Sequence, residues 1–289
     1  MNRRDCIRLL PASLLPALSG QTAKENKARF HSAICAYSFR MQFQAKTMTY
    51  AGLIRLAADL GADGIDMTVY WLPDTSDETL LPLKKLAYRS AVHIYSLAVR
   101  ANMAQPTPAL QAVEIENVRR WLTAAEKVGA SHMRVFGGAV PKGATEDQAV
   151  EWAVETLKRC ADEAAKKGIT LGVEDDGGIT TNADRTVEIV READSPWVGI
   201  NLDVGNFPKD AYSQIEMCAP YATNVHLKTL VRADGERQRA DWPRILKILG
   251  QAGYRGYLAL EYEEFPEQAT ERVPGLIAKL KDDIRSAVQ

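Results

Sequence analysis

The feature that most constrains the fold of this chain is a short apolar run that recurs along it, each time followed by a stretch of helical period. The eight runs are residues 32–37, 64–67, 93–99, 132–136, 169–174, 198–203, 224–227 and 257–261. Several of them are nearly continuous apolar segments, as is typical of parallel strands that are covered by helices. The pattern therefore predicts an α/β protein with a parallel sheet.

The segments between these runs are predicted to be helices with one apolar side. In residues 148–167, for example, Val150, Val154 and Leu157 recur at helical spacing. Four glycines follow such segments by a residue or two, where a helix end commonly needs positive φ: Gly61, Gly129, Gly168 and Gly253.

Repetition of helix, glycine and strand over about 255 residues matches the size of a (β/α)8 barrel. We therefore expect a single-domain TIM barrel over residues 31–289. An open, doubly wound sheet is the alternative, but no GxGxxG motif follows the first predicted strand.

Residues 1–30 do not belong to this pattern. Residues 1–20 contain Arg3 and Arg4, a short apolar stretch and then small residues, which is the order found in export signals. The two arginines resemble a twin-arginine signal, although Cys6 stands where such signals usually have Phe. We expect an export signal followed by a polar linker, and hence a periplasmic protein; an N-terminus that is not processed is the alternative.

Composition excludes several classes of protein. The 289 residues include 36 basic and 37 acidic side chains, and this balance argues against a nucleic-acid partner. No apolar run approaches the roughly 18 residues of a transmembrane helix, so no membrane span is expected. The four cysteines show no CxxC spacing and predict neither a zinc ribbon nor a disulfide framework. A homo-oligomer is compatible with the sequence, which does not specify one.

Polar residues gather where the last four predicted strands end, and a TIM barrel carries its chemistry at that end of the strands. The four candidates, one from each strand, are Glu174, Asp203, His226 and Glu261. Three bare carboxylates in one place would repel one another and raise their pKa values. With one imidazole, they suit a divalent ion such as Mn²⁺, Mg²⁺ or Co²⁺, or Zn²⁺. Against this, each carboxylate could instead pair with a barrel Arg or Lys, and His226 could be a buried structural residue.

The segments VEDDGG, LDVGN, VHLK and LALEYE occur in this order at the ends of predicted strands five to eight. Together they resemble the xylose-isomerase-like barrel superfamily, and within it the sugar isomerase/epimerase branch with ketose 3-epimerases and inosose dehydratases. The resemblance implies one divalent ion, Mn²⁺ in first place, held by the four candidates. It also implies that Glu174 and Glu261 are an acid/base pair that acts on a ketose or keto-sugar through a metal-bound cis-enediolate.

The chain departs from the family pattern where substrate would bind. Asp176 follows strand five where family members commonly have His, and Asn206 replaces a second common His after strand six. Asn can donate and accept hydrogen bonds but cannot shuttle a proton. Lys228 lies two residues after His226 and should point to the same side, either to bind substrate or to neutralise the carboxylates. These three residues and Arg232 are the predicted substrate contacts.

Other reactions remain open from the sequence. An enediolate that expels a β-leaving group would make the protein a dehydratase or a keto-glycoside lyase. A sugar-binding barrel without catalysis is a further alternative. A trinuclear zinc nuclease on the same barrel would need many histidines, and this chain has only four.

Overall fold

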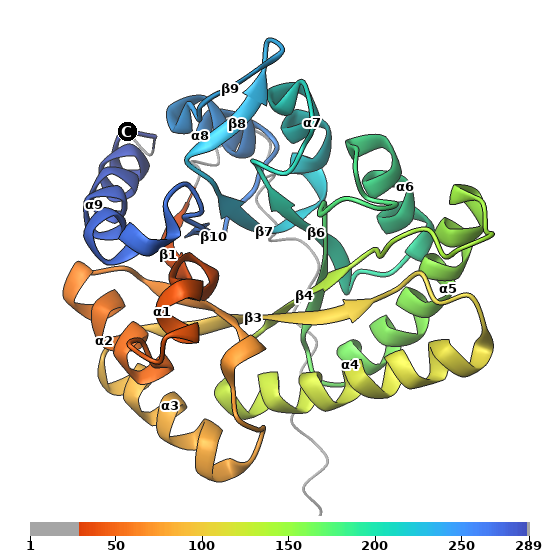
Figure 1. Ribbon diagram of the computed structural model, residues 1–289, viewed down its shortest axis with the longest axis horizontal. Coiled ribbons are helices and arrows are strands. Elements are labelled where there is room, and N and C mark those ends of the chain that lie inside the picture. The colour runs from red at the N-terminus through yellow and green to blue at the C-terminus, as the bar shows by residue number, and fades with distance from the viewer. Residues whose placement is uncertain (1–28, 288–289) are drawn as a thin grey trace, which may run out of the picture.

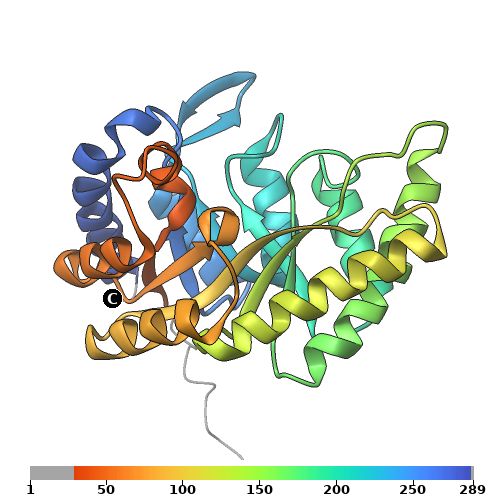
Figure 2. The same cartoon turned by 60° about the horizontal axis from the view of Figure 1, so that its bottom comes forward.

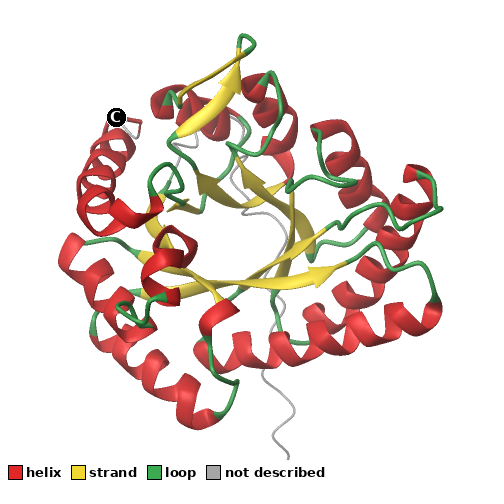
Figure 3. Cartoon of the chain, viewed as in Figure 1, coloured by secondary structure: helices red, strands yellow, loops and turns green. Residues whose placement is uncertain are grey.

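Parallel β-strands close into a barrel, and helices cover its outer surface (Figures 1 and 3). The computed structural model describes residues 29–287. The barrel strands are β1 (His31–Cys35), β2 (Gly64–Thr68), β3 (His93–Asn102), β4 (His132–Phe136), β5 (Thr170–Glu174), β6 (Val198–Asp203), β7 (Ala222–Leu227) and β10 (Tyr257–Leu260). All eight predicted strands form, and the predicted TIM barrel is confirmed.

The helices pack around the barrel between successive strands (Figure 1). They are α1 (Arg40–Gln44), α2 (Tyr50–Leu60), α3 (Asp77–Arg89), α4 (Pro108–Val128), α5 (Glu146–Ala165), α6 (Ala183–Ala193), α7 (Ala211–Cys218), α8 (Trp242–Gln251) and α9 (Ala269–Ala287). Short 3₁₀ turns occupy Ala36–Phe39, Val69–Trp71, Ala219–Tyr221 and Pro266–Gln268. The two longest helices before β5 begin at threonines whose hydroxyls accept a backbone N–H, Thr107 before α4 and Thr145 before α5.

The predicted helix-ending glycines adopt the left-handed backbone expected of them. Their φ angles are 62° at Gly61, 87° at Gly129, 65° at Gly168 and 81° at Gly253. An L side chain is strained in this region, so glycine lets each chain segment leave its helix and enter the next strand.

The apolar core has two parts. The larger part fills the layer between strands and helices and includes fully buried Leu53, Leu80 and Leu122. The smaller part, inside the barrel, contains Cys35 and Tyr95. Toward the carboxyl ends of the strands the barrel interior becomes polar, and this is where the predicted site lies.

The sequence reading missed one element, the antiparallel hairpin of β8 (Leu230–Ala233) and β9 (Glu236–Arg239). Figure 2 shows it projecting beyond the barrel. The strands join through Asp234 and Gly235, both with positive φ. Asp-Gly between two short strands is a strong hairpin signal, so the sequence did contain the information.

Two expectations concern the membrane and the N-terminus. Among the described helices, none combines the length and apolar composition that a bilayer crossing requires. The predicted export signal and nearly all of its linker lie outside the described residues.

Candidate active site

The four residues predicted from the strand ends lie together in the structure. Each offers one ligand atom, and these atoms all lie within 4.8 Å of one another. The four side chains, all buried, are Glu174 at the end of β5, Asp203 at the end of β6, His226 on β7 and Glu261 directly after β10. Strand register accounts for this, because β6 and β7 align Asp203 with His226.

His226 is held between carboxylates from three different strands. Its Nδ1 lies 2.9 Å from Glu174 Oε1 and 2.8 Å from Glu261 Oε2. Its Nε2 lies 3.0 Å from Oδ2 of Asp66 on β2. Burial alone would lower the pKa of His226, but Glu261, Asp66 and Glu174 raise it well above its ordinary value.

Asp66 was missed in the sequence reading. It is fully buried, and its Oδ1 has no hydrogen-bond partner among the described residues. The signal was a charged residue inside GIDMT, a strand that is otherwise apolar or small. A buried carboxylate in a barrel strand is uncommon unless another group pairs with it.

Two buried asparagines connect Asp66 to Glu174, Asp203, His226 and Glu261, which together are called the acid cluster. Asn224 donates to Asp66 Oδ2 at 2.8 Å and to Asn201 Oδ1 at 2.8 Å. Asn201 donates in turn to Glu174 Oε1 at 2.9 Å. The orientations of Glu174 and His226 are therefore fixed by hydrogen bonds as well as by packing.

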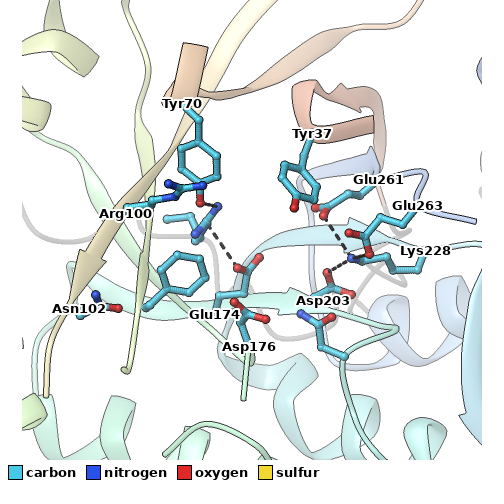
Figure 4. A pocket seen from close by; sticks show the side chains of 13 residues that line it. Tyr37, Tyr70, Arg100, Asn102, Glu174, Asp176, Asp203, Lys228, Glu261 and Glu263 are labelled. Carbon is cyan, nitrogen blue, oxygen red and sulfur yellow. Dashed lines mark hydrogen bonds and ion pairs between the residues drawn. The ribbon is translucent and has the colours of Figure 1, made fainter. Parts of the chain in front are cut away.

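Lys228 lies among the carboxylates of the site. Its Nζ lies 3.1 Å from Asp203 Oδ2 and 3.1 Å from Glu261 Oε1, and it also pairs with Glu263 (Figure 4). These contacts agree with the expectation that Lys228 neutralises the carboxylates, while its contact with substrate stays a prediction. Burial would lower the pKa of Lys228, but the Asp203, Glu261 and Glu263 carboxylates raise it well above its ordinary value.

The pKa values of Asp203 and Glu261, the two carboxylates of the cluster that contact Lys228, are shifted in opposite directions. Burial raises the pKa of Asp203 to about 7, with Lys228 opposing the shift and Glu261 adding to it. Burial would also raise the pKa of Glu261, but Lys228 and His226 outweigh it and hold that pKa well below its usual range. Glu261 is thus ionised over the whole neutral range.

A cavity of about 390 Å³ opens above the cluster, a size within the range of small-molecule sites. Of the predicted substrate contacts, Asp176, Asn206 and Lys228 line it. Arg232 does not; it lines an adjacent cavity of about 290 Å³ beside the β8–β9 hairpin. Burial raises the pKa of Asp176 to about 6, and Glu174 adds to the shift.

Two aromatic side chains near the ends of β1 and β2 differ in their relation to the cavity. Tyr37, just after β1, does line the cavity. Trp71 is not among the lining residues, and its ring stacks on Phe43 at a centroid distance of 4.8 Å. Trp71 therefore packs within the fold instead of facing the cavity.

The other side of the cavity comes from the barrel strands β3 and β4 and the turn after β2. Its lining residues are Tyr70, Arg100, Asn102, Arg134 and Phe136. Arg134 Nε lies 3.4 Å from Glu174 Oε2, and Arg134 Nη2 donates to the Tyr70 hydroxyl at 3.1 Å. Tyr70, Arg100 and Asn102 were not found from the sequence. Arg100 and Asn102 lie in the part of β3 that extends beyond the predicted strand.

The donor set fits a divalent cation. Glu174, Asp203 and Glu261 supply carboxylate oxygens, and His226 turns Nδ1 toward them because Asp66 engages Nε2. Five carboxylates line the cavity against three cationic side chains, which leaves an excess of negative charge. Carboxylates and one imidazole suit Mg²⁺, Mn²⁺, Co²⁺ and Zn²⁺.

Solved structures with the same barrel include enzymes that act on sugars. A D-psicose 3-epimerase with D-tagatose, from Clostridium cellulolyticum H10, superposes with a TM-score of 0.73 at 16% identity over 90% of this chain and 99% of its own. A xylose isomerase-like TIM barrel protein from Mycobacterium smegmatis, in complex with magnesium, has a TM-score of 0.66 at 19% identity, covering 83% of this chain and 89% of its own. At such low identity these likenesses establish a shared fold.

A dehydratase shares the fold as well. A probable 3-DHS dehydratase from Bacillus anthracis has a TM-score of 0.67 at 15% identity, covering 87% of this chain and 98% of its own. No curated protein sequence matches the chain. The sequence profile of the Xylose isomerase-like TIM barrel family matches residues 54–281, from α2 to α9. The chain therefore belongs to the Xylose isomerase-like TIM barrel family.

Proposed function

We propose that this protein is a divalent-metal-dependent isomerase or epimerase that acts on a ketose or keto-sugar. The observation that carries the proposal is the meeting of Glu174, Asp203, His226 and Glu261 at the floor of an open cavity. A cluster of this kind at the carboxyl ends of TIM-barrel strands is where such a fold performs chemistry.

The metal site of the proposal consists of these four side chains. A divalent cation held there would polarise the carbonyl of a bound sugar and acidify the neighbouring C–H. Lys228 already contacts Asp203 and Glu261, so it would share these two carboxylates with the cation.

Glu174 and Glu261 are the proposed acid/base pair. They approach His226 Nδ1 from β5 and from the end of β10, so they flank the floor of the cavity from different strands. One carboxylate takes the proton from the carbon beside the carbonyl, and an enediolate results. The other glutamate, in its carboxylic acid form, gives its proton to the opposite face, which inverts the centre and leaves this glutamate as a carboxylate. Proton transfer by a positioned carboxylate contributes about 10²–10⁴-fold in rate.

Contacts with neighbouring side chains orient Glu174 and Glu261 for the proposed proton transfers. Arg134 and Asn201 hold the two oxygens of Glu174. Lys228 holds Oε1 of Glu261 and keeps this carboxylate ionised. Asp176 and Asn206 line the cavity above them and are the proposed partners of substrate hydroxyl groups. Arg232 would reach only a substrate that extends toward the hairpin.

Elimination is the second candidate reaction. If the enediolate expels a group from the β-carbon, the same residues perform a dehydratase or keto-glycoside lyase reaction. Asn206 on the cavity favours this candidate, because it stands where related epimerases commonly have a His and cannot itself carry a proton. The shared fold with the probable 3-DHS dehydratase supports it too.

Deuterium exchange followed by NMR tests the proposal. The protein, loaded with Mn²⁺ and then diluted into D₂O, is incubated with a panel of ketoses and 3-keto-glycosides. Loss of a C–H signal with appearance of the epimer supports epimerisation, and appearance of an unsaturated product supports elimination. Binding of a sugar without any exchange, at full metal occupancy, would overturn the enzymatic proposal in favour of a sugar-binding barrel.

Lys228→Ala and Asn206→Ala then test how substrate is positioned. Loss of a charged hydrogen bond at Lys228 should lower kcat/KM by about 10- to 150-fold, and loss of the neutral Asn206 partner should cost less. Lys85→Ala, on the exposed face of α3, is the matched control. A Lys228→Ala enzyme with unchanged kcat/KM would make Lys228 a neutraliser of the acid cluster without a role toward substrate.

A further inference from the structure

Two arginines line the side of the cavity that faces the acid cluster, and neither has a role in the mechanism beyond the Arg134–Glu174 contact. Figure 4 shows Tyr70, Arg100 and Asn102 on one side of the pocket and Glu261, Glu263 and Lys228 on the other. Three carboxylates, Asp203, Glu261 and Glu263, surround Lys228 at one end of the cavity, the two guanidinium groups lie at the other end, and Glu174 contacts Arg134 between them.

Tyr70 holds both guanidinium groups. The Arg100 guanidinium stacks over its ring at 3.9 Å from the centroid, and Arg134 donates to its hydroxyl. Arg134 is also stacked over Phe136 at 4.0 Å. Both cationic side chains therefore contact Tyr70, Arg100 through the ring face and Arg134 through the hydroxyl.

The two arginines differ in their partners, because Arg134 already pairs with Glu174 and, within residues 29–287, Arg100 does not pair with a carboxylate. Arg134 is buried and shares Glu174 with His226 and Asn201. Among the described residues, no carboxylate lies within ion-pair distance of Arg100, whose side chain is exposed toward the cavity. A cationic side chain on a cavity without a carboxylate partner is a candidate to bind an anionic group of a ligand. Asn102, two residues after Arg100 on β3, adds an amide on the same side of the strand.

We propose that Tyr70, Arg100, Asn102 and Arg134 form an anion-binding subsite, and that the substrate is a keto-sugar with an anionic substituent remote from its carbonyl. A guanidinium group binds a carboxylate or phosphate through paired N–H bonds. In the described part of the chain the Arg100 guanidinium donates no hydrogen bond and is exposed on the cavity, whereas Arg134 already contacts Glu174, the Val99 carbonyl and the Tyr70 hydroxyl. The inference rests on the proposed function, because it assigns the orientation in which the sugar enters the same cavity. The keto end lies over Glu174 and Glu261, and the anionic end lies over β3.

Three matched sugars test the subsite and separate the two sources of negative charge. D-Fructose, D-fructuronate and D-fructose 6-phosphate differ only at C6, which carries a hydroxyl, a carboxylate or a phosphate. Their dissociation constants are measured by calorimetry with the Mn²⁺-loaded protein. We expect at least one anion to bind about 10-fold or more tightly than D-fructose, and its identity tells whether the carboxylate or the phosphate fits. Equal affinity for all three would overturn the inference.

Variants assign the preference to the arginines. Arg100→Gln should reduce the anion preference to within about 3-fold, Arg100→Lys should keep part of it, and D-fructose should bind all three proteins alike. Arg120→Gln is the control, since Arg120 is an exposed, ring-stacked arginine on α4, away from the cavity. Loss of affinity for D-fructose and the anions by the same factor in Arg100→Gln would show a general role and contradict the subsite.

The proposed function and the subsite can fail separately. An anion preference that depends on Arg100, without C–H exchange in any of the three sugars or the wider panel, would leave the subsite standing and reject the reaction. C–H exchange in D-fructose without any preference for the two anionic sugars would support the proposed reaction and reject the anion-binding subsite.

Discussion

Asp66 is the single residue on which the geometry of the acid cluster most depends. It joins His226 Nε2 and the Asn224 amide, and through Asn201 it is linked to Glu174. A carboxylate on one ring nitrogen of histidine directs the other nitrogen toward a metal and strengthens it as a ligand. The same contact makes Asp66 a positioning residue that never touches the substrate.

Asp66→Asn should therefore weaken metal binding while the barrel stays folded. Asn keeps the shape and one hydrogen bond but not the charge, and loss of such a partner lowers metal affinity by about 10–100-fold. Competition with a fluorescent chelator measures the Mn²⁺ dissociation constant. Asp63→Asn is the matched control, because Asp63 also neighbours a histidine, His31, but lies far from the cluster. Equal Mn²⁺ affinity in wild type and Asp66→Asn would contradict this role.

His132 gives the fold a stability that depends on pH. It is buried beside Ser96 and Thr223, and burial lowers its pKa to about 4. An unfolded chain has an ordinary histidine pKa of about 6.5, so between these values the unfolded state binds more protons. Stability that is complete above pH 6.5 is therefore lost as the pH falls toward 4.

From pH 7.5 to pH 5.5 this group alone should remove about 1.4 kcal/mol of unfolding free energy. Urea unfolding at the two pH values, in wild type and His132→Gln, measures the contribution as a difference of differences. His31→Gln, at the partly exposed start of β1, serves as the control. The same pH dependence in wild type and His132→Gln would show that other groups cause it.

At the scale of elements, the site depends on how the loops after β6 and β7 pack against each other. Gly205 lies beside the aliphatic stem of Lys228, and a Cβ there would come within 2.6 Å of Lys228 Cγ and 2.8 Å of the Leu230 carbonyl oxygen. The carbonyl belongs to the backbone and cannot move aside easily. The absence of a side chain at Gly205 therefore places the Lys228 ammonium over Asp203 and Glu261.

Gly205→Ala should displace Lys228 and cost about 1–3 kcal/mol in unfolding free energy. We also expect kcat/KM to fall as it does in Lys228→Ala, since both changes move the same ammonium. Gly275→Ala is the control, because nothing lies within 4 Å of a Cβ there and α9 favours alanine. Wild-type activity in Gly205→Ala would mean that the loop around Gly205 accommodates the added methyl group without displacing Lys228.

On the scale of the whole molecule, strands that are far apart in the sequence jointly build one site. The four clustered residues come from β5, β6, β7 and the end of β10, which are neighbours in the closed barrel, and Asp66 contacts His226 from β2. A cation that binds the folded chain and not the unfolded one stabilises the fold by mass action.

Mn²⁺ at 100 times its dissociation constant should add about 2.7 kcal/mol to the unfolding free energy. For a chain of this size that corresponds to a rise in Tm of roughly 5–10 °C, reversed by EDTA. Asp203→Asn should abolish most of the rise, whereas Asp162→Asn on α5 should keep it. No shift in wild-type protein, together with no stoichiometric metal by elemental analysis, would refute the metal site.

The predicted export signal, residues 1–20, lies outside the barrel and stays a prediction. If Arg3 and Arg4 belong to a twin-arginine signal, replacing both by Lys should retain the protein in the cytoplasm, as cell fractionation would show. A chain that begins at Phe30 should still fold and bind metal, because β1 starts at His31. Unchanged location of the double variant would reject the signal.

The sequence by itself determined the barrel and the four central residues of the site. Periodicity is local, so apolar runs, helical stripes and terminal glycines identified the strands and helix ends without any knowledge of contacts. Glu174, Asp203, His226 and Glu261 could be found because each stands at the end of a predicted strand, and the barrel rule brings strand ends together. The Asp-Gly turn of the β8–β9 hairpin was equally local and could have been recognised.

Only the tertiary structure decided what surrounds these residues. The contact of Asp66 with His226 joins residues 160 positions apart, and no local pattern encodes which strand interiors face each other. The reach of Lys228 to Asp203 depends on loop packing at Gly205, and the stacking of Arg100 on Tyr70 depends on the extension of β3 past its apolar run. Side-chain direction over such distances follows from strand register and barrel closure, which exist only in the folded chain.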